Sequence, residues 1–323
     1  MSFELLLQPF KAQRKPYVMI LFAFLVSSIA IILSLKIFPR CSSLLIVTFS
    51  IIPLIPIMVK LIEIEESRLE KSKRWYRLKN YSIIRIYALL FIGFIISFSL
   101  WYTFLPSEKS EELFREQIHS LEMEENLEPM CDSGILSKYI DEYTIKDCKV
   151  RDYGDDGRLE YIVYVENKSE PLIFVPETEE FHERRAFMRN HYFTHNFQLL
   201  FFIFLTSFIF GSGALFILVW NASIIGVYIG EIANRAMHFI TSPLGKVAVY
   251  FKTLPVSLGG LLLHGIFEVT GFFIAALAGG ILSVVLIRHN IRDKHVLKIF
   301  LDSVMLFGIA TVLIFIGAFI ESW

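Results

Sequence analysis

The chain has 323 residues, of which 54% are hydrophobic and 15% are aromatic, and its formal net charge is −1. Several stretches exceed about 18 residues without a charge, which is the usual mark of a transmembrane helix. This composition excludes a soluble globular domain, and the 3 cysteines are too few for a disulfide scaffold. We therefore predict an all-α polytopic membrane bundle of six to seven transmembrane helices, with a small α+β extracytoplasmic insert.

Five apolar runs are clear candidates for membrane spans, at residues 17–38, 44–62, 82–105, 197–219 and 299–320. The first run is too long for the apolar region of a signal peptide, so we expect it to remain as a span. A sixth run, 255–287, is longer than a hydrocarbon core of roughly 30 Å requires, and we expect it to tilt or break. The weaker run 221–240 carries Glu231 and Arg235, which could form an ion pair, and it could be a seventh span or a re-entrant segment.

Basic residues mark three regions: the segment before the first span, the loop 63–81 and the loop 288–298. Because cytoplasmic loops carry an excess of Lys and Arg, we expect these regions and the N-terminus on the cytoplasmic side of the plasma membrane. Glutamates mixed with the basic residues of 63–79 are interpreted as one solvated helix beside anionic lipid. With 221–240 as a span the chain crosses seven times, which we favour. Without it, 255–287 would have to double back as a hairpin.

The chain therefore divides into three parts. An N-terminal membrane region with three spans takes residues 1–105, an acidic extracytoplasmic insert takes 106–195, and a C-terminal membrane core with three to four spans takes 196–323. The first half of the insert has the pattern of a helix with a thin apolar face. Its second half alternates apolar and polar residues around "GDDG" and "ENKSE", which predicts a three-stranded antiparallel meander. Cys131 and Cys148 both lie in the insert and could form a disulfide.

The apolar run 255–287 carries two ionisable residues, His264 and Glu268, within "LLLHGIFEVTGFF". Their i, i+4 spacing places both on one helical face, above a groove of small residues that favours close contact with another helix. An ionisable group at mid-bilayer costs at least a few kcal/mol, so Glu268 should be protonated or have a partner, for which His264, Asn221 and Arg235 are candidates. The pair could be a structural clasp, a site for a partner or a conformational change, or a transport or catalytic site.

Metal and enzyme chemistry find little support in the sequence. His264 and Glu268 supply two ligands, whereas zinc needs three or four, and the H-E-x-x-H and G-x-S-x-G motifs do not occur. We therefore predict no metal site, no catalytic residue and no cofactor. An intramembrane enzyme would need a third catalytic or metal-binding group within about 4 Å of the pair.

Five glycines are expected at helix–helix contacts: Gly226, Gly230, Gly265, Gly279 and Gly280. The first two form a small-xxx-small pair, which favours close packing and permits self-association. Asn221 precedes this pair and is expected to cap the start of a helix. The segment 210–216, "FGSGALF", is interpreted as part of a Gly-rich packing face.

Two stretches of the C-terminal core resemble a known family. The segments "HNFQLLFFIFLTSFIFGSGALFILVWNASIIGVYIG" and "LLLHGIFEVTGFFIAALAGGILSV" are similar to the stage II sporulation protein M family of integral membrane proteins. The resemblance covers roughly residues 82–320, and the first two spans with their basic loop resemble the longer archaeal members. The insert matches no core motif of the family. The resemblance implies four recurring polar positions, to which no chemistry is assigned: Asn196, Asn221, His264 and Glu268.

This resemblance implies a protein that localises partners and couples envelope remodelling to the membrane. In endospore-forming bacteria the family acts with peptidoglycan hydrolases during engulfment. The leading interpretation is a non-enzymatic scaffold in membrane or cell-envelope remodelling, and the alternative is a permease-like subunit with His264 and Glu268 as a midplane polar site. The expected partners are membrane lipids and envelope proteins; a homo-oligomer is permitted, and no nucleic acid is expected.

Overall fold

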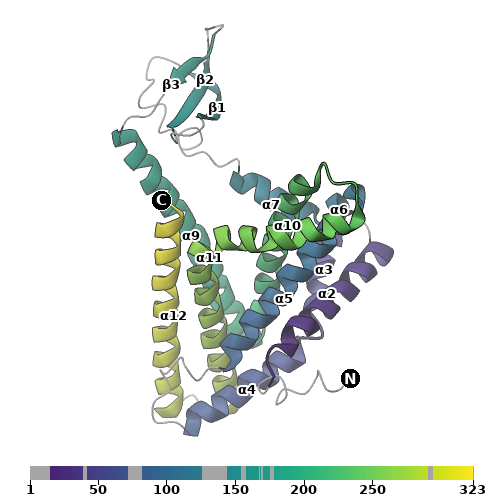
Figure 1. Cartoon of the computed structure of the whole chain (residues 1–323). Helices are drawn as coiled ribbons and strands as arrows, with labels where there is room; N and C mark the ends of the chain where they lie inside the picture. The colour runs from purple at the N-terminus through teal and green to yellow at the C-terminus, as the bar shows by residue number, and fades with distance from the viewer. Residues whose placement is uncertain are drawn as a thin grey trace.

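The structure is a computed structural model that describes residues 15–38, 42–71, 82–125, 144–153, 158–166, 168, 170–174, 178–289 and 294–322. Figure 1 shows the helices gathered into one bundle, with a small sheet beyond one end of it. Six described helices are long and apolar enough to cross a membrane, and a bent pair would make a seventh. The predicted helical bundle of six to seven spans is therefore confirmed.

The six helices are α2 (Val18–Ile37), α5 (Ser82–Phe104), α9 (Thr178–Phe210), α10 (Ala214–Met237), α11 (Pro243–Arg288) and α12 (Lys294–Glu321). The bent pair consists of α3 (Ser42–Ile51) and α4 (Ile55–Lys71), which meet at 45°. Pro53 lies in the break between them, where its missing backbone N–H and fixed φ favour the end of a helix.

The predicted boundaries around the fourth span are wrong. The run 197–219 belongs to two helices, because α9 ends at Phe210 and α10 begins at Ala214. Gly211 has a φ of 69°, a backbone conformation that glycine adopts without strain, and it makes the tight turn between them. Residues 211–213 therefore form a turn, and the expected packing is found at Gly213, where a Cβ would clash with the backbone of Thr206 on α9. Helix α10 takes the place of the weak span predicted at 221–240.

Helix α11 has 46 residues and contains Pro255. Figure 1 shows its first part lying across one end of the bundle before the helix turns to run through it. Proline removes one intrahelical hydrogen bond, which is a common cause of such bending. The part that could span a membrane is Leu263–Arg288, so 255–287 is neither a hairpin nor one straight crossing.

Tyr250 fixes the first part of α11 against α5. Its side chain is wholly buried, and its hydroxyl lies 2.6 Å from the Ser99 hydroxyl. Burial raises the pKa of Tyr250, although the hydrogen bond to Ser99 acts in the opposite direction. The phenol therefore stays neutral and serves as a packing group.

Close helix contacts form at four of the five predicted glycines. A Cβ on Gly226 would lie 2.7 Å from the Cβ of Phe98, and a Cβ on Gly230 would lie 2.5 Å from a ring carbon of Tyr102, so α10 packs closely on α5. Gly279 faces the backbone of α9, and Gly280 faces α4 and the α9–α10 turn. The prediction for Gly265 is wrong, because a Cβ there would meet no described atom within 4 Å.

The first helices of the insert pack on the bundle. They are α6 (Ser107–Leu113) and α7 (Arg115–Glu125). Leu113 and Phe114 are fully buried in the main core, and Ser43 of α3 donates a 2.9 Å hydrogen bond to the carbonyl oxygen of Leu113. These helices therefore extend the bundle at the end that we call the insert end. The opposite end, where α4 and α11 finish, we call the basic end.

The second half of the insert forms the predicted three-stranded antiparallel meander, in the order β1 (Ile145–Tyr153), β2 (Arg158–Val165) and β3 (Leu172–Phe174). Its small core is Tyr161, Val163 and Val165, against which Phe187 of α9 packs. The predicted "GDDG" turn lies outside the described residues. Cys148 is disulfide-bonded, whereas Cys131, the predicted partner, also lies outside the described residues.

Candidate functional site

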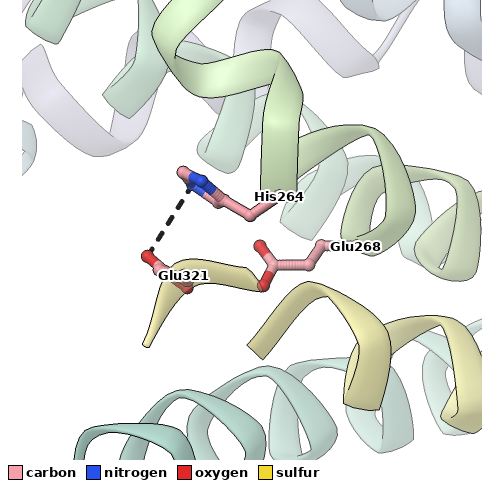
Figure 2. A group of neighbouring side chains, drawn as sticks. All are labelled: His264, Glu268 and Glu321. Carbon is pink, nitrogen blue, oxygen red and sulfur yellow. Dashed lines mark ion pairs between the residues drawn. The ribbon is translucent and has the colours of Figure 1, made fainter. Parts of the chain in front are cut away.

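Three ionisable side chains from two helices come together at the insert end (Figure 2). His264 and Glu268 project from one face of α11, and Glu321 lies in the last turn of α12. The Nε2 atom of His264 lies 3.7 Å from a carboxylate oxygen of Glu321. One potential ligand atom from each of the three residues lies within 4.8 Å of the others. We call this cluster the triad.

Glu268 is the most buried member of the triad. The residue is only 9% exposed, and one of its carboxylate oxygens accepts a 2.9 Å hydrogen bond from the side-chain amide of Asn196 on α9. Gly317 of α12 leaves room for this side chain, because a Cβ there would lie 2.5 Å from Cγ of Glu268. Three helices therefore fix one carboxylate: α11 carries it, α9 donates to it and α12 makes room for it.

The small-residue groove below the triad receives another helix, as the sequence predicts. Gly271 lies close to the backbone of α12, since a Cβ there would lie 3.1 Å from the carbonyl oxygen of Ala310. Ala275 and Ala278 are fully buried. The face that carries His264 and Glu268 is therefore the packing face of α11.

The triad lies near the ends of two candidate spans rather than at their centres, which does not favour the midplane interpretation. His264 is the second residue of the candidate span Leu263–Arg288, and Glu321 is the last residue of the candidate span Val296–Glu321. The His264 and Glu321 side chains are 23% and 18% exposed, so both reach the surface of the bundle.

Two of the partners predicted for Glu268 are also wrong. Because α10 already begins at Ala214, Asn221 lies inside that helix, where its amide donates to the carbonyl oxygen of Ile217 at 2.8 Å. It therefore neither caps a helix start nor joins the triad. Arg235 instead lies 3.6 Å from Glu231, one turn away on α10. Asn196, which the sequence marked only through the family resemblance, is the residue that bonds Glu268.

Glu321 is the third member of the triad, and sequence analysis did not predict it. It lies far along the chain from His264, and only the pairing of α11 with α12 brings the two together. A carboxylate in the last turn of an apolar helix is an available signal, although it does not identify its partner. With Glu321, whose carboxylate lies 3.7 Å from His264, the site has an imidazole and two carboxylates with donor atoms within 4.8 Å of one another.

A family comparison covers the part of the chain that holds this site. The sequence model of the family described as Stage II sporulation protein M matches residues 86–323, which is well over half of the chain. The chain belongs to the stage II sporulation protein M family. A search of curated proteins and a search of solved structures found no match. In this family member the triad and Asn196 lie within the matched region, whereas α2, α3 and α4 precede it.

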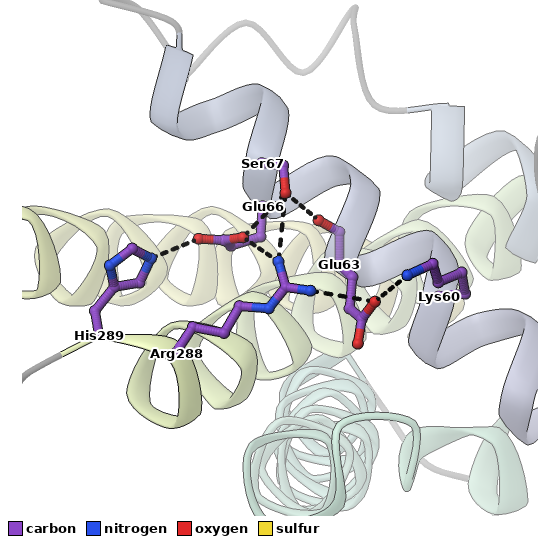
Figure 3. A network of polar contacts seen from close by, with 6 residues as sticks. All are labelled: Lys60, Glu63, Glu66, Ser67, Arg288 and His289. Carbon is purple, nitrogen blue, oxygen red and sulfur yellow. Dashed lines mark hydrogen bonds and ion pairs between the residues drawn. The ribbon is translucent and has the colours of Figure 1, made fainter.

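A second polar cluster of this family member joins α4 to α11 at the basic end (Figure 3). The Arg288 guanidinium lies 3.1 Å from a carboxylate oxygen of Glu66 and 3.2 Å from one of Glu63. His289 Nε2 lies 3.1 Å from the other carboxylate oxygen of Glu66, and Lys60 lies 2.8 Å from Glu63. We call this cluster the basic-end network.

The interpretation of 63–79 as a solvated helix is therefore wrong for its first residues. The Glu65 and Glu66 side chains are nearly fully buried, at 2% and 1% exposure. Glu65 accepts hydrogen bonds from the backbone N–H and the hydroxyl of Ser82, at the start of α5. Both carboxylates belong to helix–helix contacts, and the rest of that stretch from residue 72 lies outside the described residues.

An acidic cavity of about 860 Å³ opens beside α6 and α7 at the insert end. It is lined by Tyr102, Glu108, Glu111, Glu112, Arg115, Glu116, Ile118, His119, Glu122 and Glu231. The Tyr102 hydroxyl donates to Glu231 at 3.3 Å, so the Glu231–Arg235 pair stands at the wall of this cavity. The insert end of this family member is therefore strongly acidic.

Proposed function

We propose that this stage II sporulation protein M family member is a non-enzymatic membrane scaffold that recruits protein partners during membrane or cell-envelope remodelling. One observation carries the proposal: Glu268 is enclosed by helices and bonded to Asn196. A transport site at this carboxylate would need a route through the whole bundle near the midplane, with helices broken there. The triad instead stands at the end of two candidate spans, in continuous helices.

The sheet of the insert offers a surface for a partner. Tyr161, Val163 and Val165 face its small core, so the alternate residues point away from it. On that outer face Tyr164 and Ile173 are 39% and 67% exposed. Such apolar exposure on a domain with a thin core supports an interaction role.

The orientation of the scaffold follows the charges. Lys60 and Arg288 lie at the basic end, whereas the glutamates of α6 and α7 lie at the insert end. The positive-inside bias then favours a cytoplasmic basic end and an extracytoplasmic insert. The disulfide at Cys148 supports this orientation, because disulfides persist in oxidising compartments outside the cytosol.

Site-specific photo-cross-linking of the full chain in its native membrane tests the scaffold. A cross-linker at Ile173 of the sheet should capture defined envelope proteins. The control position is Phe210, which is 70% exposed at the end of an apolar span and should capture lipid. Capture of the same proteins from both positions, or of none from Ile173, would contradict the proposal. Capture of an ATPase from the basic end would favour the permease instead.

A further inference from the structure

We propose that the triad of His264, Glu268 and Glu321 binds one first-row divalent transition-metal ion of the zinc class. This inference does not rest on the scaffold function. It reverses the expectation of no metal site, which depended on counting two ligands in the sequence. Glu321 supplies the third, and three protein ligands with one open position form a known type of zinc site.

The separations of the donor atoms suit such an ion. In a tetrahedral zinc site with bonds of roughly 2.0–2.1 Å, two ligand atoms lie about 3.3 Å apart. His264 Nε2 and its partner oxygen on Glu321 are 3.7 Å apart, and all three donors lie within 4.8 Å of one another. Small rotations of the two exposed side chains are therefore enough to close the ligands around an ion.

The charges also suit a divalent cation. Two carboxylates and an imidazole nitrogen that converge on one point form a donor set that attracts a divalent cation. The imidazole nitrogen favours zinc, cobalt or iron over magnesium and calcium, which prefer oxygen ligands alone.

The neighbouring residues fix the Glu268 carboxylate and leave the other two ligands accessible to an ion. Asn196 orients the Glu268 carboxylate through its 2.9 Å hydrogen bond, as groups behind a metal ligand commonly do. Gly317 allows Glu268 to lie against α12. The partial exposure of His264 and Glu321 gives an ion access from the insert end. Bound there, the ion would link α11 to α12, with water as its fourth ligand.

Zinc binding by the full chain tests this site. The protein is purified in detergent without a polyhistidine tag, stripped with a chelator, and dialysed against zinc in excess magnesium. We expect one equivalent of zinc by elemental analysis. His264→Ala and Glu321→Gln should each weaken binding by more than about 100-fold, and Asn196→Ala by about 10- to 100-fold, as a positioning residue.

The matched controls are His119→Ala and Glu111→Gln, which change a histidine and a glutamate of the acidic cavity at the same end. They should leave zinc binding unchanged. Cobalt substitution gives a second readout, because a tetrahedral cobalt site absorbs strongly in the visible range. This spectrum is measured on the wild-type protein, so it does not depend on the folding of any variant. A wild-type protein without stoichiometric zinc, a cobalt spectrum typical of six oxygen ligands, or equal losses in the control variants would overturn the proposal.

Discussion

The two polar clusters at the ends of α11 use similar residues in different ways. The basic-end network sets Glu63 and Glu66 against the cations of Lys60 and Arg288, with His289 beside them. The triad sets two carboxylates beside one imidazole. The first arrangement balances its charges from side chains on the two helices that it joins. The second brings together three donor atoms of the kinds that ligate metal ions. The comparison teaches that similar side chains between helices can form a fixed joint or a candidate binding site, depending on how their donor atoms are arranged.

Removing the cation of the fixed joint should have the largest effect on stability. Arg288→Ala leaves the Glu66 carboxylate, which is 1% exposed, without its guanidinium partner. Breaking a buried pair in this way costs about 3 kcal/mol in the free energy of unfolding, at the lower end because Arg288 itself is 38% exposed. Unfolding of the purified protein in mixed micelles measures the loss. An unchanged free energy would show that the network is not a joint.

Zinc should stabilise the protein at the triad and leave the basic-end network unaffected. At a free zinc concentration 100-fold above the dissociation constant, we expect a gain of about 2.7 kcal/mol in the free energy of unfolding. The gain should persist in Arg288→Ala and vanish in His264→Ala. Thermal unfolding with and without chelator measures it. A gain in both variants would place the ion elsewhere.

Crowding Glu268 should disturb the triad without removing a ligand. Gly317→Ala places a Cβ 2.5 Å from Cγ of Glu268, and overpacking of this kind costs about 1–3 kcal/mol. The control is Gly308→Ala on the same helix, where a Cβ meets no described atom within 4 Å. That change should be neutral or stabilising by up to about 1 kcal/mol, because alanine favours helix. Equal unfolding free energies for the two variants would contradict the geometry.

Removing an exposed ion pair should have the smallest effect on the free energy of unfolding, and it gives a reference value for the two clusters. Arg235 is 73% exposed beside Glu231, so Arg235→Ala should change the free energy of unfolding by less than about 0.5 kcal/mol. Raising the ionic strength should reduce even that difference. A loss comparable with that of Arg288→Ala would mean that exposure does not distinguish the clusters.

The sequence was most informative where one physical property decides the structure. The length of apolar runs predicted α2, α5 and α12 closely, and alternation predicted the β1–β2–β3 meander. It failed at the α9–α10 turn, because the residues around Gly211 are as apolar as a span and only its positive φ marks the turn.

Contacts between distant segments explain the other failures. The position of Glu321 beside His264 depends on how α12 packs on α11, and no local pattern carries that information. Glu65 and Glu66 have the charge pattern of a solvated helix. In the fold they are buried where they contact Ser82 and Arg288, which are distant in the sequence. Asn196 had no local signal at all, and only the family resemblance marked it.

Helix α9 runs from the sheet past the triad to the turn into α10. It is unbroken over 33 residues, which at 1.5 Å per residue makes a rod of roughly 50 Å. Phe187 near one end touches the sheet, Asn196 near the middle holds Glu268, and Gly211 follows the other end. Because one unbroken helix carries both contacts, a change in its tilt at the sheet would also move the Asn196 amide relative to Glu268.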